Sequence, residues 1–239
     1  MEPQPIQEPL QQVASNLHQA NTMKSCEGPE NTVELERLRI EILGGNNQLS
    51  NRIIGIPKRY YGKVMPDTEI AKQIKKDFDN GENLFLHGIS GSGKTHIAIC
   101  LLLNYFSKNI YLNSGKIEVK ANKRPEFLPV SELFFKLKQS YHESEKITDT
   151  EIIDKYSDIN LLCLDDFCSE RASGWTRDIF NLIITRRYNN MKRTIMTSNK
   201  NIQEVGTIYD DRIASRICEM GNIIEMPEID YRVLGKHKK

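Results

Sequence analysis

Eight consecutive residues in the first half of the chain have the types and spacing of a phosphate-binding loop. They follow the pattern G-x-x-x-x-G-K-[ST] and run from Gly88 to Thr95. Glycine allows tight turns where a Cβ would collide, and the free N–H groups of such a loop, with the positive end of the following helix, attract phosphate. An apolar run, 84–86, precedes the loop, and an apolar, helix-compatible segment, 97–103, follows it. This strand–loop–helix context predicts a nucleoside triphosphate site.

The side chains of the loop have separate expected roles. Lys94 is placed to reach the β- and γ-phosphates, and the Thr95 hydroxyl is placed to ligate Mg²⁺. The residues expected to bind the nucleotide are Gly88, Ser90, Gly91, Ser92, Gly93, Lys94, Thr95 and His96.

Two adjacent carboxylates, Asp165 and Asp166, end the apolar run 159–164. Because this run lacks alternation, it predicts a strand buried on both faces, which is typical of a parallel sheet. Open α/β sheets bind ligands at the carboxyl ends of their strands. We therefore expect Asp165 to hold Mg²⁺ together with Thr95, and Asp166 to orient or deprotonate an attacking water.

Two further polar features could complete a hydrolytic site. Asn199 ends an expected strand, 193–199, that closes in a polar Thr-Ser-Asn, and its amide could position water, although a turn-forming asparagine is the alternative. Arg212 and Arg216 are four residues apart and share a helix face. Either could be an arginine finger for phosphate, but from spacing alone surface salt bridges are the better interpretation.

Composition limits the class of protein that carries these residues. The chain has 239 residues, of which 38% are hydrophobic, and this suits one or two domains with an ordinary core. No apolar run approaches the roughly 18 residues of a membrane span, and the first residues lack a secretion signal. We expect a cytoplasmic protein that binds no membrane. Cys163 and Cys168 lack a second Cys or His pair at zinc-site spacing.

The N-terminal residues differ from the remainder. Residues 1–50 hold seven Glu and three Lys or Arg, a net of −4, and residues 1–30 are rich in Gln, Pro and Glu, which predicts disorder. Residues 32–43 fit a helix better than a strand, and this helix either docks a partner or packs on its own domain. Residues 44–50 resemble a linker. We expect a partly disordered partner-binding segment, 1–50, before a domain at 51–239.

Several elements are expected between the two chemical regions and after them. Residues 110–119 predict a hairpin, residues 127–130 a core strand, and Ser131 the cap of a helix that continues to Tyr141. A long helix is expected from Ser173 to Tyr188, and a last strand at 222–226.

Taken together, five blocks of the chain resemble the helicase-loader branch of the AAA+ ATPases, the DnaC/DnaI/IstB group. The blocks cover residues 55–60, 86–98, 161–167, 175–199 and 212–216. The fifth block also includes a separate closing piece, Asp230-Tyr231-Arg232. The resemblance implies a three-layer α/β P-loop AAA+ ATPase domain with a parallel sheet, a short N-terminal segment, and a helical lid that is absent or truncated. Cys168 departs from the glycine of many relatives, and the insertion 109–124 has no counterpart.

The same resemblance assigns roles to residues. Asn199 matches sensor 1, and Arg216 matches the arginine finger that reaches a neighbouring subunit's nucleotide. Arg212 stays undecided, and Arg232 could substitute for a sensor 2 arginine. Residues 56–60 match the segment that covers the adenine. The region from Ser131 to Asp158 resembles one that faces single-stranded DNA, so contact with DNA and an ordinary solvated helix face are equal alternatives for Lys136, Lys138 and Tyr141.

The function implied is ATP-dependent loading of a replicative DNA helicase onto single-stranded DNA. The cofactors would be ATP and Mg²⁺, the N-terminal segment would hold the helicase, and ATP would assemble a homo-oligomer whose hydrolysis is slow until DNA or assembly stimulates it. One alternative is an IstB-like transposition helper ATPase that binds DNA and recruits a transposase. A small-molecule kinase and a non-enzymatic decoy of a host helicase are further alternatives.

Overall fold

A computed structural model describes residues 29–45, 47–114, 116–121, 123–140, 148–169 and 173–234. Its helices are α2 (Pro29–Leu43), α3 (Gln48–Ile54), the short 3₁₀ helix η1 (Lys58–Tyr60), α4 (Glu69–Asp79), α5 (Lys94–Lys108), α6 (Val130–Ser140), α7 (Asp149–Asp158), α8 (Gly174–Asn189), α9 (Ile202–Ile208), α10 (Asp211–Met220) and α11 (Tyr231–Leu234). Its strands are β1 (Asn83–His87), β2 (Ile110–Asn113), β3 (Lys116–Val119), β4 (Pro125–Pro129), β5 (Leu161–Phe167), β6 (Arg193–Ser198) and β7 (Gly221–Glu225).

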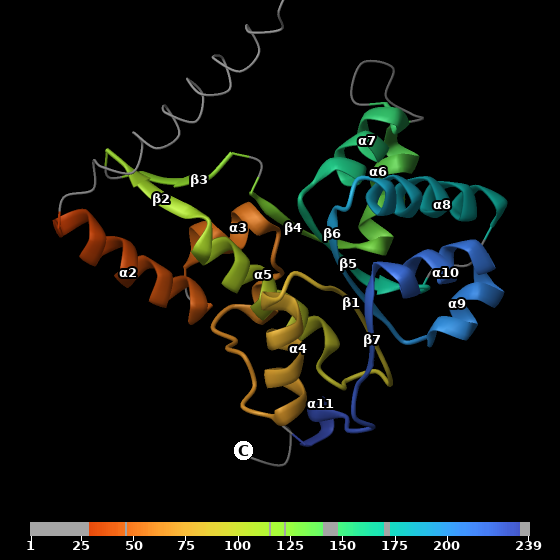
Figure 1. Cartoon of the computed structure of the whole chain (residues 1–239), viewed down its shortest axis with the longest axis horizontal. Helices are drawn as coiled ribbons and strands as arrows, with labels where there is room; N and C mark the ends of the chain where they lie inside the picture. Colours follow the sequence, from red (N-terminus) through yellow and green to blue (C-terminus); the bar gives the residue numbers. More distant parts are fainter. Residues whose placement is uncertain are drawn as a thin grey trace, which may run out of the picture.

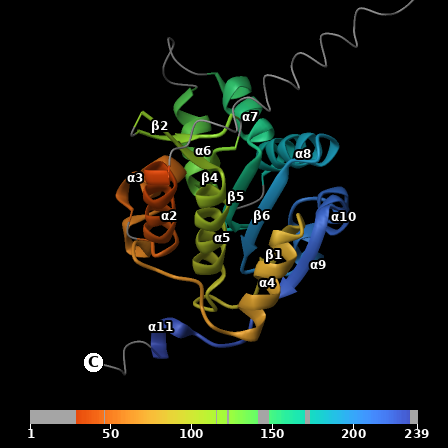
Figure 2. The same cartoon turned by 60° about the vertical axis from the view of Figure 1, so that its left-hand side comes forward.

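Five strands form one parallel sheet in the order β4-β5-β6-β1-β7. One hydrophobic cluster lies between the sheet and helices α2 to α5, and a second lies between the other face and helices α6 to α10. Figures 1 and 2 show these two helical layers on opposite faces of the sheet. The predicted three-layer α/β architecture is therefore confirmed, and it places the ends of β1, β5 and β6 at one edge.

The N-terminal helix α2 is part of the folded domain. Leu35 and Ile42 are buried and join the cluster around α5, whereas Val33 and Ile40 on the other side of α2 are 73% and 70% exposed. The helix expected at 32–43 is thus present and packs on its own domain. The expected linker is shorter than predicted, since the Asn47 side chain accepts a hydrogen bond from the Ser50 N–H and α3 begins at Gln48. The disorder expected for residues 1–30 concerns mainly residues outside the described ones.

The predicted hairpin and core strand are both present. Strands β2 and β3 pair antiparallel, with Tyr111 opposite Glu118, and β4 pairs with β5. The prediction that Ser131 caps the next helix is wrong, because α6 already begins at the fully buried Val130, directly after β4. Tyr141 lies outside the described residues. The long helix expected from Ser173 to Tyr188 is present as α8, and Ser173 caps it by accepting a hydrogen bond from the Thr176 N–H.

One arginine of α8 forms hydrogen bonds with the end of α7 and with the segments that begin β5 and β6, at the amino edge of the sheet. Arg187 of α8 is fully buried and donates to the carbonyl oxygens of Tyr156, Ile159 and Arg193 and to the Thr194 hydroxyl. These acceptors satisfy a charge that would otherwise be costly to bury. Arg187 therefore fixes where α7 ends and where β5 and β6 begin, which sets the register of the strands that lead to the opposite edge.

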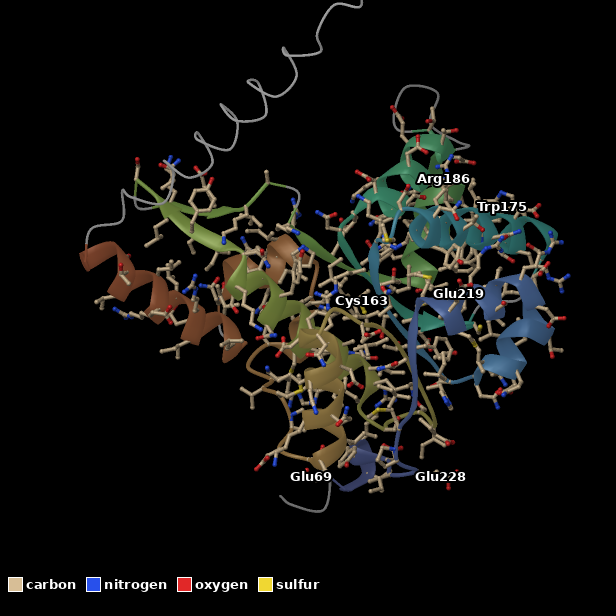
Figure 3. All side chains as sticks on the ribbon, in the orientation of Figure 1. Glu69, Cys163, Trp175, Arg186, Glu219 and Glu228 are labelled. Atoms are coloured by element: carbon tan, nitrogen blue, oxygen red, sulfur yellow. The ribbon has the colours of Figure 1, made fainter. Side chains whose placement is uncertain are left out.

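Two other features bear on the class of protein. Cys163 lies in the middle of β5 inside the molecule (Figure 3), and burial raises the pKa of its thiol well above the ordinary value, so it packs as a neutral core residue. In the part of the chain that the structure describes, no helix combines the length and the apolar character that a bilayer crossing requires.

Candidate nucleotide-binding site

The phosphate-binding loop connects β1 to α5 and occupies residues 88–93. Gly88, Gly91 and Gly93 all have positive φ, at 143°, 85° and 94°. A Cβ on Gly91 would collide with the carboxylate of Asp230, and one on Gly88 would lie 3.2 Å from the carbonyl oxygen of Met226. Both backbone conformation and lack of space therefore require glycine here.

Lys94 is held inside this loop. Its Nζ donates to the carbonyl oxygens of Gly88 and Ile89 at 2.8 and 2.7 Å, and the residue is buried. Burial lowers the pKa of Lys94, while the charges of Asp166 and Asp165 oppose that shift. The ammonium group is thus positioned beside the glycine turns where phosphate oxygens would lie.

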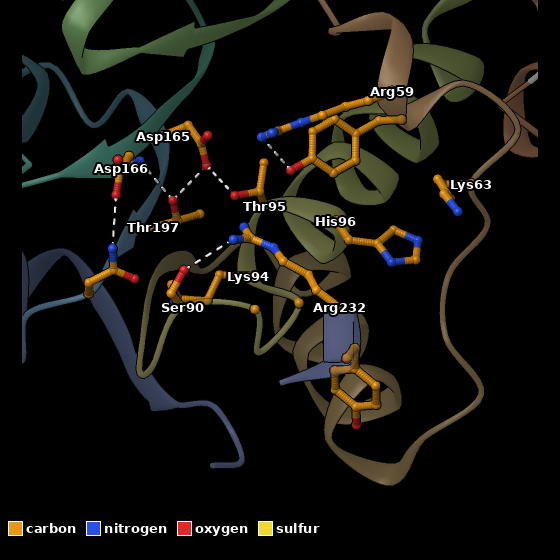
Figure 4. A pocket seen from close by; sticks show the side chains of 15 residues that line it. Arg59, Lys63, Ser90, Lys94, Thr95, His96, Asp165, Asp166, Thr197 and Arg232 are labelled. Atoms are coloured by element: carbon orange, nitrogen blue, oxygen red, sulfur yellow. Dashed lines mark hydrogen bonds between the residues drawn. The ribbon is translucent and has the colours of Figure 1, made fainter. Parts of the chain in front are cut away.

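A carboxylate from β5 meets the loop at its end. Oδ1 of Asp165 accepts hydrogen bonds from the hydroxyls of Thr95, at 2.8 Å, and Thr197, at 2.7 Å (Figure 4). Burial raises the pKa of Asp165, and the two hydroxyls act against this by stabilising the charged form. A hydroxyl and a carboxylate brought together in this way are oxygen ligands of the kind that Mg²⁺ prefers.

Asp166 reaches the same cavity because β5 is irregular at this point. Consecutive side chains of a regular strand point to opposite faces, but the pairing of β5 with β6 shifts between Leu164 and Phe167, and Asp166 has a φ of 59°. Its N–H donates to the Thr197 hydroxyl at 3.0 Å, and its Oδ1 accepts from the Asn199 amide at 3.2 Å. The bulge therefore presents both carboxylates on one side.

These groups line a cavity of about 550 Å³ at the carboxyl edge of the sheet. Nine of the residues predicted from the sequence line it: Ser90, Gly91, Gly93, Lys94, Thr95, His96, Asp165, Asp166 and Asn199. Gly88 and Ser92 belong to the loop behind it, and the Ser92 hydroxyl lies 3.4 Å from Lys94 Nζ. Arg216 does not line this cavity; it is half-buried and donates to Oδ1 of Asn181 on the neighbouring helix α8.

Two lining residues, Thr197 and Lys63, had no role assigned from their sequence motif. Thr197 stands between the two carboxylates, and the signal for it was its place at the end of the strand beside β5. Lys63 lies in an irregular segment with no motif that could have indicated it. Arg59 and Tyr60 belong to the segment expected over the adenine, and the Arg59 guanidinium lies over the Tyr60 ring at 4.7 Å.

The C-terminal segment closes over the loop from the other side. The Tyr231 N–H donates to Gly91 O at 3.0 Å, and Arg232 Nη1 donates to the Ser90 hydroxyl at 3.2 Å. The sequence left open whether Arg232 or Arg212 approaches a nucleotide. Arg232 lies in the cavity, whereas Arg212 pairs with Asp210 at 3.3 Å and is 75% exposed.

A second, mostly apolar cavity of about 290 Å³ adjoins the first and shares Gly93, His96 and Tyr231 with it. Its remaining walls are Pro66, Thr68, Ile70, Ser92, Ile97, Met226 and Pro227. His96 Nε2 lies 2.8 Å from the carbonyl oxygen of Val64, and burial lowers the pKa of this imidazole. A cavity lined by Arg59, Lys63, Lys94 and Arg232 beside an apolar one suits a ligand with an anionic end and an apolar end.

Comparisons with known proteins agree with this geometry. The model of the family described as IstB-like ATP binding protein matches residues 69–232. The replicative helicase loader DnaC of Escherichia coli (strain K12) is 25% identical over 171 residues, which cover 70% of this chain and 64% of that protein. This chain therefore aligns with less than two thirds of that relative.

Solved structures give the same result. The crystal structure of the DnaC helicase loader has a TM-score of 0.57 at 27% identity and covers 72% of this chain and 100% of that one. The crystal structure of DnaI has a TM-score of 0.55 at 25% identity, covering 72% and 95%.

Proposed function

Because the chain belongs to the IstB-like ATP binding protein family and carries a DnaC/IstB-like AAA+ ATPase domain, we propose that it loads a replicative DNA helicase onto single-stranded DNA. ATP binding and the ATPase class follow from the family. The loading activity, its partners and the assembly it needs are our inference, supported by the similarity to DnaC and by the construction of the site.

One observation carries the catalytic part of the proposal. A continuous set of hydrogen bonds joins Thr95, Asp165, Thr197, Asp166 and Asn199 at the mouth of the phosphate loop. Thr95 and Asp165 would hold Mg²⁺ through oxygen atoms, and the ion would offset the negative charge of the phosphates. Asp166, oriented by Asn199, would orient or deprotonate the attacking water. Lys94 and the loop N–H groups would hold the β- and γ-phosphates.

Two arginines would complete the site from different subunits. Arg232 is already at the phosphate loop of its own chain, on Ser90, and we assign it to the phosphates from that side. Arg216 points away from this cavity, so we infer that it serves a neighbouring subunit's nucleotide. ATP would then be enclosed between copies of the chain, and its hydrolysis would weaken their contact.

The helicase-binding surface is proposed to include α2. Its outer side is a shallow apolar groove lined by Thr32, Val33, Glu36, Arg37, Ile40 and Glu41. Exposed apolar patches rimmed by polar residues are a feature of protein-binding sites. Helix α2 thus combines a side docked on the domain with an outward apolar side, and substitution of Val33 and Ile40 by Asp should abolish helicase capture while nucleotide binding persists.

For single-stranded DNA, α6 offers fewer cations than the sequence indicated. Lys136 is already engaged by Glu132 and by the Tyr156 hydroxyl, whereas Lys138 is exposed. The proposal therefore assigns phosphate contact to Lys138. The alternative of a transposition helper is not favoured, since the curated relative reported above is a helicase loader.

The decisive experiment is mass-resolved solution sizing with a non-hydrolysable ATP analogue, with and without a dT oligonucleotide, at low and physiological salt. The proposal expects a multi-subunit species that requires the analogue and that the oligonucleotide stabilises. A monomer under every condition would exclude the shared site. A second assay measures the activity of a replicative helicase on a single-stranded circle with and without this chain. If the chain assembles but does not increase that activity, the ATPase assignment stays and the loader role is excluded.

A further inference from the structure

The hairpin formed by β2 and β3 has two different faces. Ile110 and Leu112 are buried, and Ile117 and Val119 pack partly buried against the cluster around α5. Because opposite residues of an antiparallel pair share a face, the register places Tyr111, Asn113, Lys116 and Glu118 on the outer side. The hairpin is therefore fixed to the domain by its apolar face and presents a polar face outward.

Strand β3 and the segment that follows it are basic although the whole chain is nearly neutral. Residues 116–124 hold three lysines, one arginine and one glutamate, a net of +3, against +1 for the whole chain. Lys116, Lys120, Lys123 and Arg124 are exposed. Elsewhere many cations have carboxylate partners, as at Lys72, Lys75 and Lys155. Among the described residues, none of the four hairpin cations forms a salt bridge.

The local structure holds these cations in place. Arg124 donates from Nε and Nη2 to the carbonyl oxygen of Ile53, and the Lys120 N–H donates to Asn109 O. The carboxylate of Glu118, on the same side of the hairpin, accepts from the Tyr111 hydroxyl and the Asn113 amide. Three lysine ammonium groups, Lys116 on β3 and Lys120 and Lys123 in the segment after it, are therefore left for an external anion.

We propose that this hairpin and the segment after it, through Lys116, Lys120 and Lys123, form a binding surface for the phosphate backbone of duplex DNA. A two-stranded β-ribbon fits the major groove of B-DNA, and lysines on it and directly after it would contact phosphates without reading sequence. An acidic protein surface is a less suitable partner, because the surface combines unpaired charge with no exposed large apolar side chain among those of 110–121 and 123–124.

The surface is separate from the ATP site. The hairpin follows the carboxyl end of α5, whereas the phosphate loop precedes its amino end, and fifteen helical residues span about 22 Å. Figure 1 shows the hairpin beside α2, on the opposite side of the molecule from α11. Duplex binding here therefore leaves the nucleotide cavity free, and it does not depend on the loader role proposed above.

The test compares two triple variants of the full chain. One is Lys116→Gln/Lys120→Gln/Lys123→Gln. The control is Lys72→Gln/Lys75→Gln/Lys76→Gln on α4, which changes net charge by the same amount. Affinity for a 30-base-pair duplex and for a dT oligonucleotide is measured by fluorescence anisotropy over a range of salt concentrations. Thermal melting and ATP-analogue affinity verify folding of each variant.

We expect the slope of log K against log[salt] for the duplex to become shallower by about 2.7 in the hairpin variant, because each lost phosphate contact removes about 0.9. The control slope should stay near that of the wild type. Equal changes in both variants, an unchanged hairpin variant, or a wild-type chain that binds no duplex would overturn the proposal. A loss confined to the dT oligonucleotide would also overturn it. Single Lys→Gln variants, each expected to change the slope by about 0.9, provide the answer if the triple variant melts early.

Discussion

The hydroxyl of Thr95 and the carboxylate of Asp165 are 70 residues apart in sequence and share a hydrogen bond of 2.8 Å. Thr197 donates to the same carboxylate oxygen. Hydrogen bonds from the start of α5 and from the end of β6 therefore meet at one carboxylate oxygen at the end of β5. The carboxylate is oriented by the protein itself, and this preorganisation is what a catalytic metal site needs.

Substitution of Thr95 tests this relationship. Thr95→Val removes a hydroxyl that donates to Asp165 and would ligate Mg²⁺, so the ATPase rate should fall roughly 100-fold, on the scale of losing one preorganised polar group. Thr95→Ser keeps the hydroxyl and should retain most of the activity. Steady-state rates over a range of Mg²⁺ concentrations measure both effects. Wild-type Mg²⁺ dependence in Thr95→Val would exclude Thr95 as a ligand.

Asp165→Asn should separate stability from activity. Burial raises the pKa of Asp165 in the folded protein above its unfolded value, so the folded state keeps a proton that the unfolded chain has already lost. Stability therefore decreases as pH rises from the unfolded to the folded pKa, and this deficit persists at neutral pH. The amide oxygen of the variant can still accept from both threonine hydroxyls without a buried charge. The variant should melt higher than the wild type at pH 7 without ligand and should lose turnover.

A melting temperature at pH 7 that falls in Asp165→Asn would contradict this account. Differential scanning fluorimetry between pH 4 and pH 8 is the measurement. The advantage of the variant should shrink as pH falls through the raised pKa, since the wild-type carboxyl then becomes neutral as well.

Lys94→Ala should weaken nucleotide binding and leave the fold intact. Among the described residues, the Nζ group bonds only to loop carbonyls and to Ser92, so no other element depends on it. Its loss removes a charged contact to phosphate worth about 1.5–3 kcal/mol, or roughly 10- to 150-fold in Kd. Titration of a fluorescent ATP analogue measures the affinity, and circular dichroism serves as the folding control. An unchanged Kd would remove Lys94 from the binding site.

Arg216→Ala should leave nucleotide affinity unchanged and abolish turnover in the assembly by a factor of about 10³ or more, as loss of an arginine finger does. Arg212→Ala is the matched control, because Arg212 lies one turn away on α10 and pairs with Asp210. Mixing Arg216→Ala with Lys94→Ala subunits shows whether Arg216 acts on the nucleotide of its own subunit or on that of a neighbouring subunit. Recovery of activity in the mixture supports action between subunits, and failure to recover while each variant still assembles opposes it.

Arg187→Met should destabilise the domain without entering the chemistry. It leaves four acceptors at the amino edge of the sheet without their buried donor, at a cost of about 3–5 kcal/mol, and this corresponds to a fall in Tm of roughly 6–20 °C. The neighbouring Arg186 is partly exposed and pairs with Asp154, so Arg186→Met should cost below about 1 kcal/mol. Thermal melts of the two variants provide the comparison, and equal melting temperatures would refute the anchoring role of Arg187.

The parts of the site that a local pattern determines could be predicted from the sequence. The loop from Gly88 to Thr95 depends on the conformational needs of adjacent residues, and the buried strand before Asp165 is evident from its unbroken apolar run. The parallel sheet followed from the same run. In each case neighbouring residues in the chain contain the physical information.

The parts of the site that depend on long-range packing could not be predicted from the sequence. The role of Thr197 requires the register between β5 and β6, and the position of Arg232 requires the chain to return from β7 to the phosphate loop. The error at Ser131 has a similar origin, since burial of Val130 starts the helix one residue before the residue with the best capping side chain. Arg187 was part of a family block, but its buried hydrogen bonds depend on three elements that only the fold brings together.

The left-handed backbone at Asp166 also restricts which residues evolution or an experimenter can place there. Aspartate, asparagine and glycine accept a φ of 59° at little cost, whereas a longer or branched side chain does so with strain. Exchange of this carboxylate for glutamate would therefore alter the bulge as well as the reach of the side chain. The informative replacement is asparagine, because it keeps the shape of the turn and removes only the charge.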